Sequence, residues 1–283
     1  MTTQNLYKKI VVPLDGSPLA EVALPYAEEV AGKMESEIVL LTVLPTEEPD
    51  EYLNHQRYVG KVVDITKRQV DKYSENTSKK LIKVGTATRT GNPAEGILDY
   101  VENGNMCLIV MATHGRSGVG RWAVGSVADK VIRATTRQPL LIIRAKGAHP
   151  DVRAKRILKK ALIPLDGSET SEAVIPYFSD IALRLQMELT LLRVITKNNG
   201  SLVSADAYLS DWCRQLGDKG AIVKYEVRAG SPADQIIDLA DELASDLVVM
   251  STRGQTGVNL WSLGSVAQKV LLGGNTPLLL IRA

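Results

Sequence analysis

The sequence VPLDGS at residues 12–17 returns as IPLDGS at residues 163–168, so that Asp15 and Asp166 lie 151 residues apart. The sequence GSV at residues 125–127 returns at residues 264–266, at an offset of 139 residues. Matching blocks in the same order at a long spacing are the signature of an internal repeat. The chain is therefore two copies of one unit, and its 283 residues give each copy enough length for a core of its own.

The repeat also predicts the domain boundaries and the place where the copies differ in length. We expect a first domain at residues 1–146, a second at residues 157–283, and a linker at residues 147–156, where glycine, proline and cations stand without an apolar period. The first copy is longer by 12 residues (151 minus 139), and the excess falls between Pro45 and Gly91. Charged residues and tyrosines in that stretch predict a longer helix and loop.

Short β-branched runs alternate with segments of helical period in each copy, which is typical of a parallel sheet with crossover helices. Their apolar centres suit strands that are covered on both faces. Ser17 is placed as the N-cap of the first helix, with Pro18 at its first position, and we expect Pro25 to kink that helix. The strands that we predict in the first copy are residues 9–13, 37–44, 86–90, 108–112 and 140–144.

Composition excludes several classes of partner. Lys plus Arg is 34 and Asp plus Glu is 32, so no net field favours nucleic acid or an anionic membrane. We find no export signal, and no apolar run approaches the roughly 20 residues that span a bilayer. Cys107 and Cys213 form no CxxC pair, which fits a reducing compartment. We expect Cys107 to be buried and to pack as a small hydrophobic residue. We therefore expect a cytoplasmic protein whose ligand is a small molecule.

The loop after the fourth predicted strand carries the chemistry. Ala112 ends that strand, Gly115 follows it, and Ser126 after Gly125 opens the next helix. Glycine lets the backbone approach a ligand closely, and free N–H groups at a helix N-terminus favour phosphate. Because open α/β sheets bind ligands at the carboxyl edge of their strands, this loop predicts an anion site there. The corresponding residues of the second copy are Ser251, Gly254, Gly264 and Ser265.

These loops, together with Asp-Gly-Ser after the first strand of each copy, resemble the universal stress protein family. Its nucleotide-binding members carry Gly, two residues, Gly, nine residues, and then Gly followed by Ser or Thr. The resemblance covers both copies nearly end to end. It implies two tandem α/β open sandwiches, each a five-stranded parallel sheet flanked by helices, of the adenine nucleotide alpha hydrolase-like, Rossmann-like kind. It also implies ATP as the ligand, with or without Mg²⁺, or else ADP or AMP, and a regulatory role in stress response.

Carried onto this sequence, the family's site assigns Asp15 to the ribose and adenine side and the main chain of Val43 to the adenine edge. The phosphates would lie against backbone N–H groups and hydroxyls of the loop. The predicted nucleotide-binding residues of the first copy are Pro13, Leu14, Asp15, Val43, Met111, Ala112, His114, Gly115, Arg116, Gly125, Ser126 and Val127. Those of the second copy are Pro164, Leu165, Asp166, Val194, Met250, Ser251, Arg253, Gly254, Gly264, Ser265 and Val266.

The last strand of each copy predicts the assembly. Residues 140–143 and 278–281 are apolar on both faces, and the resemblance implies that each lies at the edge of its sheet. Unpaired backbone groups at a sheet edge invite another strand. We expect the two edges to pair antiparallel within one chain, as a pseudo-dimer of domains, and whole chains to form a homodimer.

Several site residues have a second interpretation. Asp15 can simply close an Asx turn before its helix. His114 is a positive charge facing phosphate or a surface residue, because its counterpart Arg253 can be neither a base nor a metal ligand. The family's first loop glycine is Ala112 here and Ser251 in the second copy, where a β-carbon would be strained if the position needed a positive φ.

The sequence gives no sign of an active site. We find no Ser-His-Asp or Cys-His arrangement that recurs in both copies, and no metal-ligand spacing. We therefore expect a binding protein rather than an enzyme. Two rival hypotheses are a dimerisation scaffold that has lost the nucleotide and a very slow ATP hydrolase.

Overall fold

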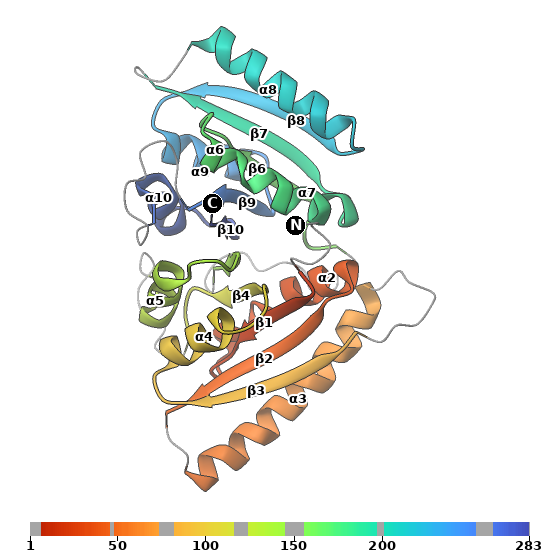
Figure 1. The fold of residues 1–283 in the computed structure, drawn as a ribbon, viewed down its shortest axis with the longest axis vertical. Helices are drawn as coiled ribbons and strands as arrows, with labels where there is room; N and C mark the ends of the chain where they lie inside the picture. The colour runs from red at the N-terminus through yellow and green to blue at the C-terminus, as the bar shows by residue number, and fades with distance from the viewer. Residues whose placement is uncertain are drawn as a thin grey trace. The chain divides into compact units, whose positions relative to one another are not determined.

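The computed structural model describes residues 7–45, 48–73, 82–115, 124–144, 156–196, 201–252 and 263–282. The chain divides into two compact units, Met1–Ile157 and Leu158–Ala283 (Figure 1). The predicted linker at residues 147–156 lies outside the described residues except for Arg156. The domain boundaries that we read from the sequence therefore stay predictions.

The first unit is built on a parallel sheet with the strand order β3-β2-β1-β4-β5. The centre of β1 is wholly buried, with Ile10, Val11 and Val12 all 0% exposed, as strands covered on both faces require. The predicted strands are confirmed, with small shifts at the ends of the third and fifth. The observed strands are β1 (Lys9–Pro13), β2 (Glu37–Leu44), β3 (Val84–Thr90), β4 (Leu108–Ala112) and β5 (Leu140–Ile143).

Helices connect these strands and cover both faces of the sheet. The connections from β1 through β2 to β3 run one way along the sheet, and those from β3 through β4 to β5 run the other way. Because such crossovers are right-handed, the reversal puts the two sets of helices on opposite faces. Accordingly α2 packs against α3, and α4 packs against α5. The helices are α1 (Pro18–Glu21), α2 (Leu24–Met34), α3 (Pro49–Tyr73), α4 (Pro93–Glu102) and α5 (Ser126–Ala134).

The first helix differs from its prediction. Ser17 caps it as expected, with its hydroxyl accepting from the Ala20 N–H at 3.2 Å. Instead of one helix kinked at Pro25, the chain forms two helices, of which α1 ends at Glu21 and α2 begins at Leu24. Proline offers no N–H to the carbonyl four residues earlier, and its ring clashes with that carbonyl. The helix therefore breaks before the proline.

The second unit repeats the architecture, with the strand order β10-β9-β6-β7-β8, all parallel. Its strands are β6 (Lys160–Pro164), β7 (Glu188–Ile195), β8 (Ile222–Ala229), β9 (Leu247–Ser251) and β10 (Leu278–Ile281). Its helices are α6 (Glu169–Glu172), α7 (Val174–Arg184), α8 (Leu202–Gly217), α9 (Pro232–Glu242) and α10 (Ser265–Gly273). The predicted longer helix of the first copy is confirmed, because α3 has 25 residues and its counterpart α8 has 16.

The strand order places a binding edge beside β1 in the first unit. The connections leave β1 and β4 in opposite directions, so their carboxyl ends open a crevice at the point where the order reverses. In addition, β1 ends at Pro13 opposite Leu41, whereas β2 continues to Leu44. The end of β2 therefore extends past its neighbour on the β1 side.

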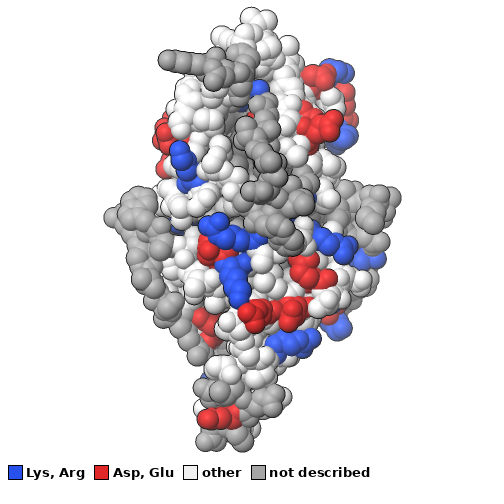
Figure 2. Space-filling view, turned by 60° about the vertical axis from the view of Figure 1, so that its left-hand side comes forward, with Lys and Arg blue, Asp and Glu red and all other residues white. Residues whose placement is uncertain are grey.

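Charges of both signs are mixed on the surface. Figure 2 shows basic and acidic side chains next to each other on the face that it draws. On the first unit, Lys130 Nζ lies 2.8 Å from Glu95 Oε1, and Arg133 Nε lies 2.9 Å from Asp129 Oδ1. In the part of the chain that the structure describes, no helix has the length and apolar character needed to cross a membrane.

Candidate functional site

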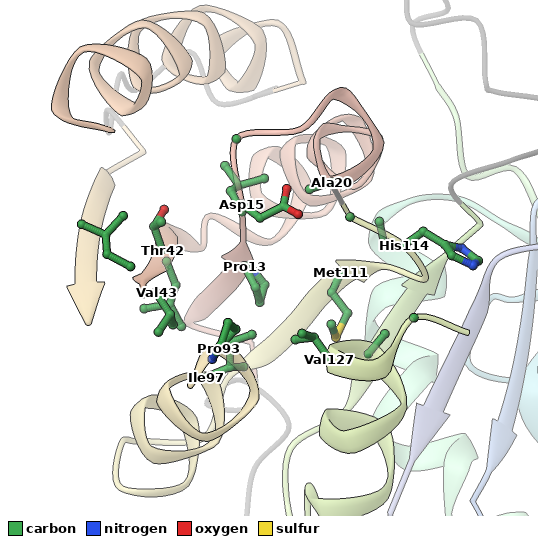
Figure 3. Close-up of a pocket in the computed structure, with 18 of the residues that line it drawn as sticks. Pro13, Asp15, Ala20, Thr42, Val43, Pro93, Ile97, Met111, His114 and Val127 are labelled. Atoms are coloured by element: carbon green, nitrogen blue, oxygen red, sulfur yellow. The ribbon is translucent and has the colours of Figure 1, made fainter. Parts of the chain in front are cut away.

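A cavity of about 660 Å³ opens at the carboxyl ends of β1, β2 and β4 in the first unit (Figure 3). It has the size of known small-molecule sites, roughly 300 to 1,000 Å³. Every predicted residue of the first copy lines it except Arg116, which lies outside the described residues. The predicted residues that the structure brings together here are Pro13, Leu14, Asp15, Val43, Met111, Ala112, His114, Gly115, Gly125, Ser126 and Val127.

Asp15 closes the Asx turn that the sequence allowed and also lines the cavity. Its Oδ1 accepts from the Ser17 N–H at 2.9 Å and from the Ser17 hydroxyl at 2.6 Å, which closes an Asx turn before α1. Its Oδ2 lies on the cavity side, where a β-carbon built on Gly115 would be 2.1 Å away. The turn therefore fixes the carboxylate, and only glycine at position 115 leaves room for it.

The main chain of Val43 faces the cavity because β1 is shorter than β2. The Leu41 carbonyl accepts from the Leu14 N–H at 2.8 Å, so Leu41 directs its main chain toward β1. Residues two apart in a strand direct these groups to the same side, whereas the Leu44 carbonyl bonds Gly91 on the β3 side at 2.8 Å. The N–H and carbonyl of Val43 therefore point past the end of β1 and into the crevice.

Thr42 is a cavity residue that the sequence analysis did not single out. Its side chain is 4% exposed, and its Oγ1 has no hydrogen-bond partner among the described residues. Helices α3 and α4 supply further walls, and Figure 3 shows Pro93 and Ile97 facing the cavity. The added lining residues from these two helices are Asn54, His55, Tyr58, Pro93 and Ile97.

The start of α5 forms the electropositive end of the cavity, with one correction to the prediction. The Gly125 N–H donates to the Thr113 carbonyl at 2.8 Å, so it is not available to a phosphate. The N–H groups of Ser126, Val127 and Ala128 belong to the first helical turn, which has no carbonyl of its own to bond. The positive end of the helix dipole, which these three N–H groups carry, therefore faces the cavity.

The backbone is not strained where the family's first loop glycine is replaced by Ala112 and Ser251. Ala112 and Ser251 are the last residues of β4 and β9. Neither is among the described residues with a positive φ. A β-carbon therefore causes no backbone strain at either position.

His114 is not a surface residue, contrary to one of its two predicted roles. Its side chain is 6% exposed, and its Nδ1 lies 3.0 Å from Thr113 Oγ1. Figure 3 shows its ring directed away from the other cavity side chains. The ring packs beside the loop rather than toward the centre of the cavity.

The second unit keeps the Asx turn and the strand geometry but has an arginine at one position that lines the cavity of the first unit. The Ser168 N–H donates to Asp166 Oδ1 at 3.0 Å, and the Leu165 N–H donates to the Leu192 carbonyl at 2.8 Å, as in the first unit. Where the first unit has Thr42, the second has Arg193, whose Nη1 donates to the Leu165 carbonyl at 3.3 Å. In the sequence, Arg193 stands out only as a charged residue within the apolar strand ELTLLRVI, and it was not among the predicted site residues.

The loop of the second unit is only partly described. The Gly264 N–H donates to the Thr252 carbonyl at 2.7 Å, which repeats the correction made for Gly125. Val266 follows Ser265 in the first turn of α10, and Val194, Met250 and Pro164 lie on strands as predicted. Arg253 and Gly254 lie outside the described residues.

Comparison with known proteins decides the family. The model of the universal stress protein family matches residues 6–144 and 158–282. The chain belongs to the universal stress protein family. Universal stress protein MJ0531 of Methanocaldococcus jannaschii is 31% identical over 149 residues, which is 50% of this chain and 84% of that protein.

Two relatives share the tandem length. Universal stress protein Slr1230 of Synechocystis sp. is 22% identical over 297 residues, covering 97% of this chain and all of that protein. The crystal structure of a universal stress protein from Archaeoglobus fulgidus superposes with a TM-score of 0.73 at 19% identity, covering 97% of this chain and 98% of that one. The fold predicted from the sequence, two tandem Rossmann-like domains of this family, is thereby confirmed.

Proposed function

We propose that the chain binds an adenine nucleotide, with ATP as the first candidate, in the cavity of its first unit. In this proposal it acts as a nucleotide-dependent regulator in stress response rather than as an efficient enzyme. One observation carries the proposal. A single cavity brings together a fixed carboxylate, the main-chain groups of a strand end and the N-terminus of α5.

The nucleoside end of the cavity has the chemistry that adenosine needs. The Asp15 carboxylate is an acceptor for ribose hydroxyls, and Ser17 holds it in place. The Val43 main chain offers one donor and one acceptor, which complement the acceptor nitrogen and the exocyclic amine of adenine. Apolar side chains such as Ile97 and Met111 provide walls for a flat base.

The phosphate end rests on helix α5. Its first-turn N–H groups and positive dipole favour an anion, and the Ser126 hydroxyl adds a donor. Arg116, one residue beyond the described part of the loop, is our candidate for a further cation. Any Mg²⁺ would be held mainly by the phosphates, because this ion keeps most of its water.

The arrangement favours binding over turnover. In the described part of the cavity, Asp15 is tied into the Asx turn by two bonds from Ser17, and His114 Nδ1 lies beside the Thr113 hydroxyl. These contacts hold both side chains in place and favour neither of them as a general base for hydrolysis. We therefore assign the bound nucleotide a structural and regulatory role.

Calorimetric titration with ATP tests the proposal. Asp15→Asn keeps the size of the side chain but removes its charge, and charged hydrogen bonds contribute about 1.5 to 3 kcal/mol each. We expect at least about tenfold weaker binding, and unchanged binding by Asp71→Asn, which alters an exposed carboxylate on α3. Equal affinity of Asp15→Asn and wild type would refute the site. No binding by either protein would favour the scaffold hypothesis.

We also propose that β5 and β10 pair antiparallel within one chain and that whole chains form a homodimer. Each of these strands ends the strand order of its own unit, and an edge strand carries unpaired backbone groups. Hydrogen exchange should show equal, strong protection of both strands, and sedimentation should give twice the mass of one chain. Fast exchange in either strand would contradict the pairing, and a monomer mass would contradict the homodimer.

A further inference from the structure

Arg193 is a buried arginine within strand β7 of the second unit. Its side chain is 9% exposed, and its Nη1 donates to the Leu165 carbonyl oxygen at 3.3 Å. Its guanidinium carbon lies 5.8 Å from the centre of the Tyr208 ring, within the range of a cation–π contact. A β-carbon on Gly167 would lie 3.0 Å from Nη1. The guanidinium therefore fills the space between the end of β6, the turn after it and helix α8.

The repeat places each of these contacts at the cavity of the first unit. Position 193 corresponds to position 42 at the offset of 151 residues, and the same offset relates the strand end and the turn glycine. The first-unit counterparts all line the 660 Å³ cavity. Arg193 corresponds to Thr42, Leu165 to Leu14, and Gly167 to Gly16.

The aromatic partner matches as well. The Tyr58 hydroxyl donates to Glu21 Oε1 at 2.8 Å, and the Tyr208 hydroxyl donates to Glu172 Oε1 at the same distance. The two tyrosines therefore hold equivalent places on α3 and α8. Tyr58 lines the cavity of the first unit, whereas Tyr208 lies against the Arg193 guanidinium.

We propose that Arg193 occupies the nucleoside part of the second unit's site with its own side chain, so that the chain binds one adenine nucleotide instead of two. This inference rests on the proposed function of the first unit. A nucleoside entering the second site would have to displace the guanidinium from the Leu165 carbonyl and from the Tyr208 ring. A buried charge that loses its partners is costly, so the displacement opposes binding.

The first unit shows what the substitution changes. The Thr42 side chain has only three heavy atoms, against seven for arginine, and Thr42 lies beside Val43 in the lining of the cavity (Figure 3). The Asx turn of Asp166 and the first turn of α10 are retained in the second unit. We therefore expect a nucleotide site to reappear there when the arginine is shortened.

The experiment compares ATP stoichiometry by calorimetry for the full chain and three variants. Arg193→Thr should add one site per chain, giving two where wild type has one. Thr42→Arg should weaken the first site at least tenfold. The control Arg214→Thr removes an exposed arginine of α8, which pairs with Asp211 outside the cavity, and should leave the stoichiometry at one. Circular dichroism and thermal melting verify that each variant is folded.

The number of ATP sites that Arg193→Thr adds decides the inference, whether or not the first unit binds ATP. Two sites in wild type, or no added site in folded Arg193→Thr, would overturn it. A lost site in Arg193→Thr would also overturn it, because the arginine would then be a ligand. If wild type binds none and Arg193→Thr binds one, the inference stands and the proposed function of the first unit fails. Asp15→Asn in the Arg193→Thr background should leave one site, in the second unit.

Discussion

Replacing Gly115 by alanine is the smallest change that should disable the proposed nucleotide site. A β-carbon there would lie 2.1 Å from Oδ2 and 3.0 Å from Cγ of Asp15, so the carboxylate oxygen would have to move. The Asp15 side chain cannot rotate away without losing the N–H and hydroxyl donors of Ser17, at 2.9 Å and 2.6 Å. We therefore expect the substitution to disrupt the Asx turn and to displace the carboxylate that we propose as the ribose acceptor.

The magnitude follows from the bonds that are lost. Hydrogen bonds to a charged acceptor contribute about 1.5 to 3 kcal/mol each when well formed, and less where solvent reaches them. Asp15 is only half-buried, so we expect a loss of about 1 to 2 kcal/mol in the free energy of unfolding. Loss of the carboxylate from the ribose should weaken ATP binding by about 10- to 100-fold.

Titration calorimetry and denaturant unfolding measure the two effects on one preparation. The control is Gly60→Ala, because a β-carbon on this exposed glycine of α3 meets nothing within 4 Å. It should bind ATP as wild type does and gain about 0.5 to 1 kcal/mol of stability from helix propensity. Wild-type affinity in Gly115→Ala would refute the reasoning, since it would show that the Asp15 carboxylate does not contact the nucleotide.

Three further predictions concern the loop, turnover and pH. Gly125→Val should weaken ATP binding without unfolding the first unit, because its β-carbon would lie 3.0 Å from the Thr113 carbonyl oxygen and shift the start of α5. Calorimetry, with an unchanged circular dichroism spectrum, measures this effect, and unchanged affinity would contradict the prediction. ATP hydrolysis should run far below the median enzyme rate of about 10 per second, and a phosphate-release assay near that rate would refute the binding role. Burial raises the pKa of Glu28 to about 7, although Thr66 and Lys72 oppose the shift. Between about pH 4.5 and about pH 7 the folded state therefore holds a proton on Glu28 that the unfolded state releases. Over this range the free energy of unfolding of wild type should fall by up to about 3 kcal/mol relative to Glu28→Gln as the pH rises. Parallel pH profiles of the two proteins would contradict this prediction.

The fold was largely predictable because the repeat and the apolar strands are local signals. The Asp-Gly-Ser blocks and the buried strand runs depend on short stretches of sequence, and β1, β2 and β4 lie where those runs predicted. The first helix was not predicted correctly. The sequence indicated a disturbance at Pro25, but whether proline kinks or ends a helix depends on the packing of both halves.

The candidate site was predictable where its residues sit at strand ends, and less so where helices complete it. Gly115 follows from the topology of a parallel sheet, since carboxyl ends meet at one edge, whereas Asp15 and Val43 were assigned through the family resemblance. Tyr58 comes from a helix whose rotation the sequence does not give. The bond from Gly125 to the Thr113 carbonyl is likewise a long-range contact across a loop. Arg193 was visible as a charge in an apolar strand, but only the fold shows that its guanidinium lies against the Leu165 carbonyl.

The most direct test of the central claim is native mass spectrometry of the purified chain during titration with ATP. We predict a complex with one ATP per chain in wild type, and its loss in Asp15→Asn at the same ATP concentration, with Asp71→Asn unchanged. The complex should also release an intact adenine nucleotide on denaturation. A spectrum that shows only the free chain at millimolar ATP, or equal occupancy in wild type and Asp15→Asn, would contradict the account.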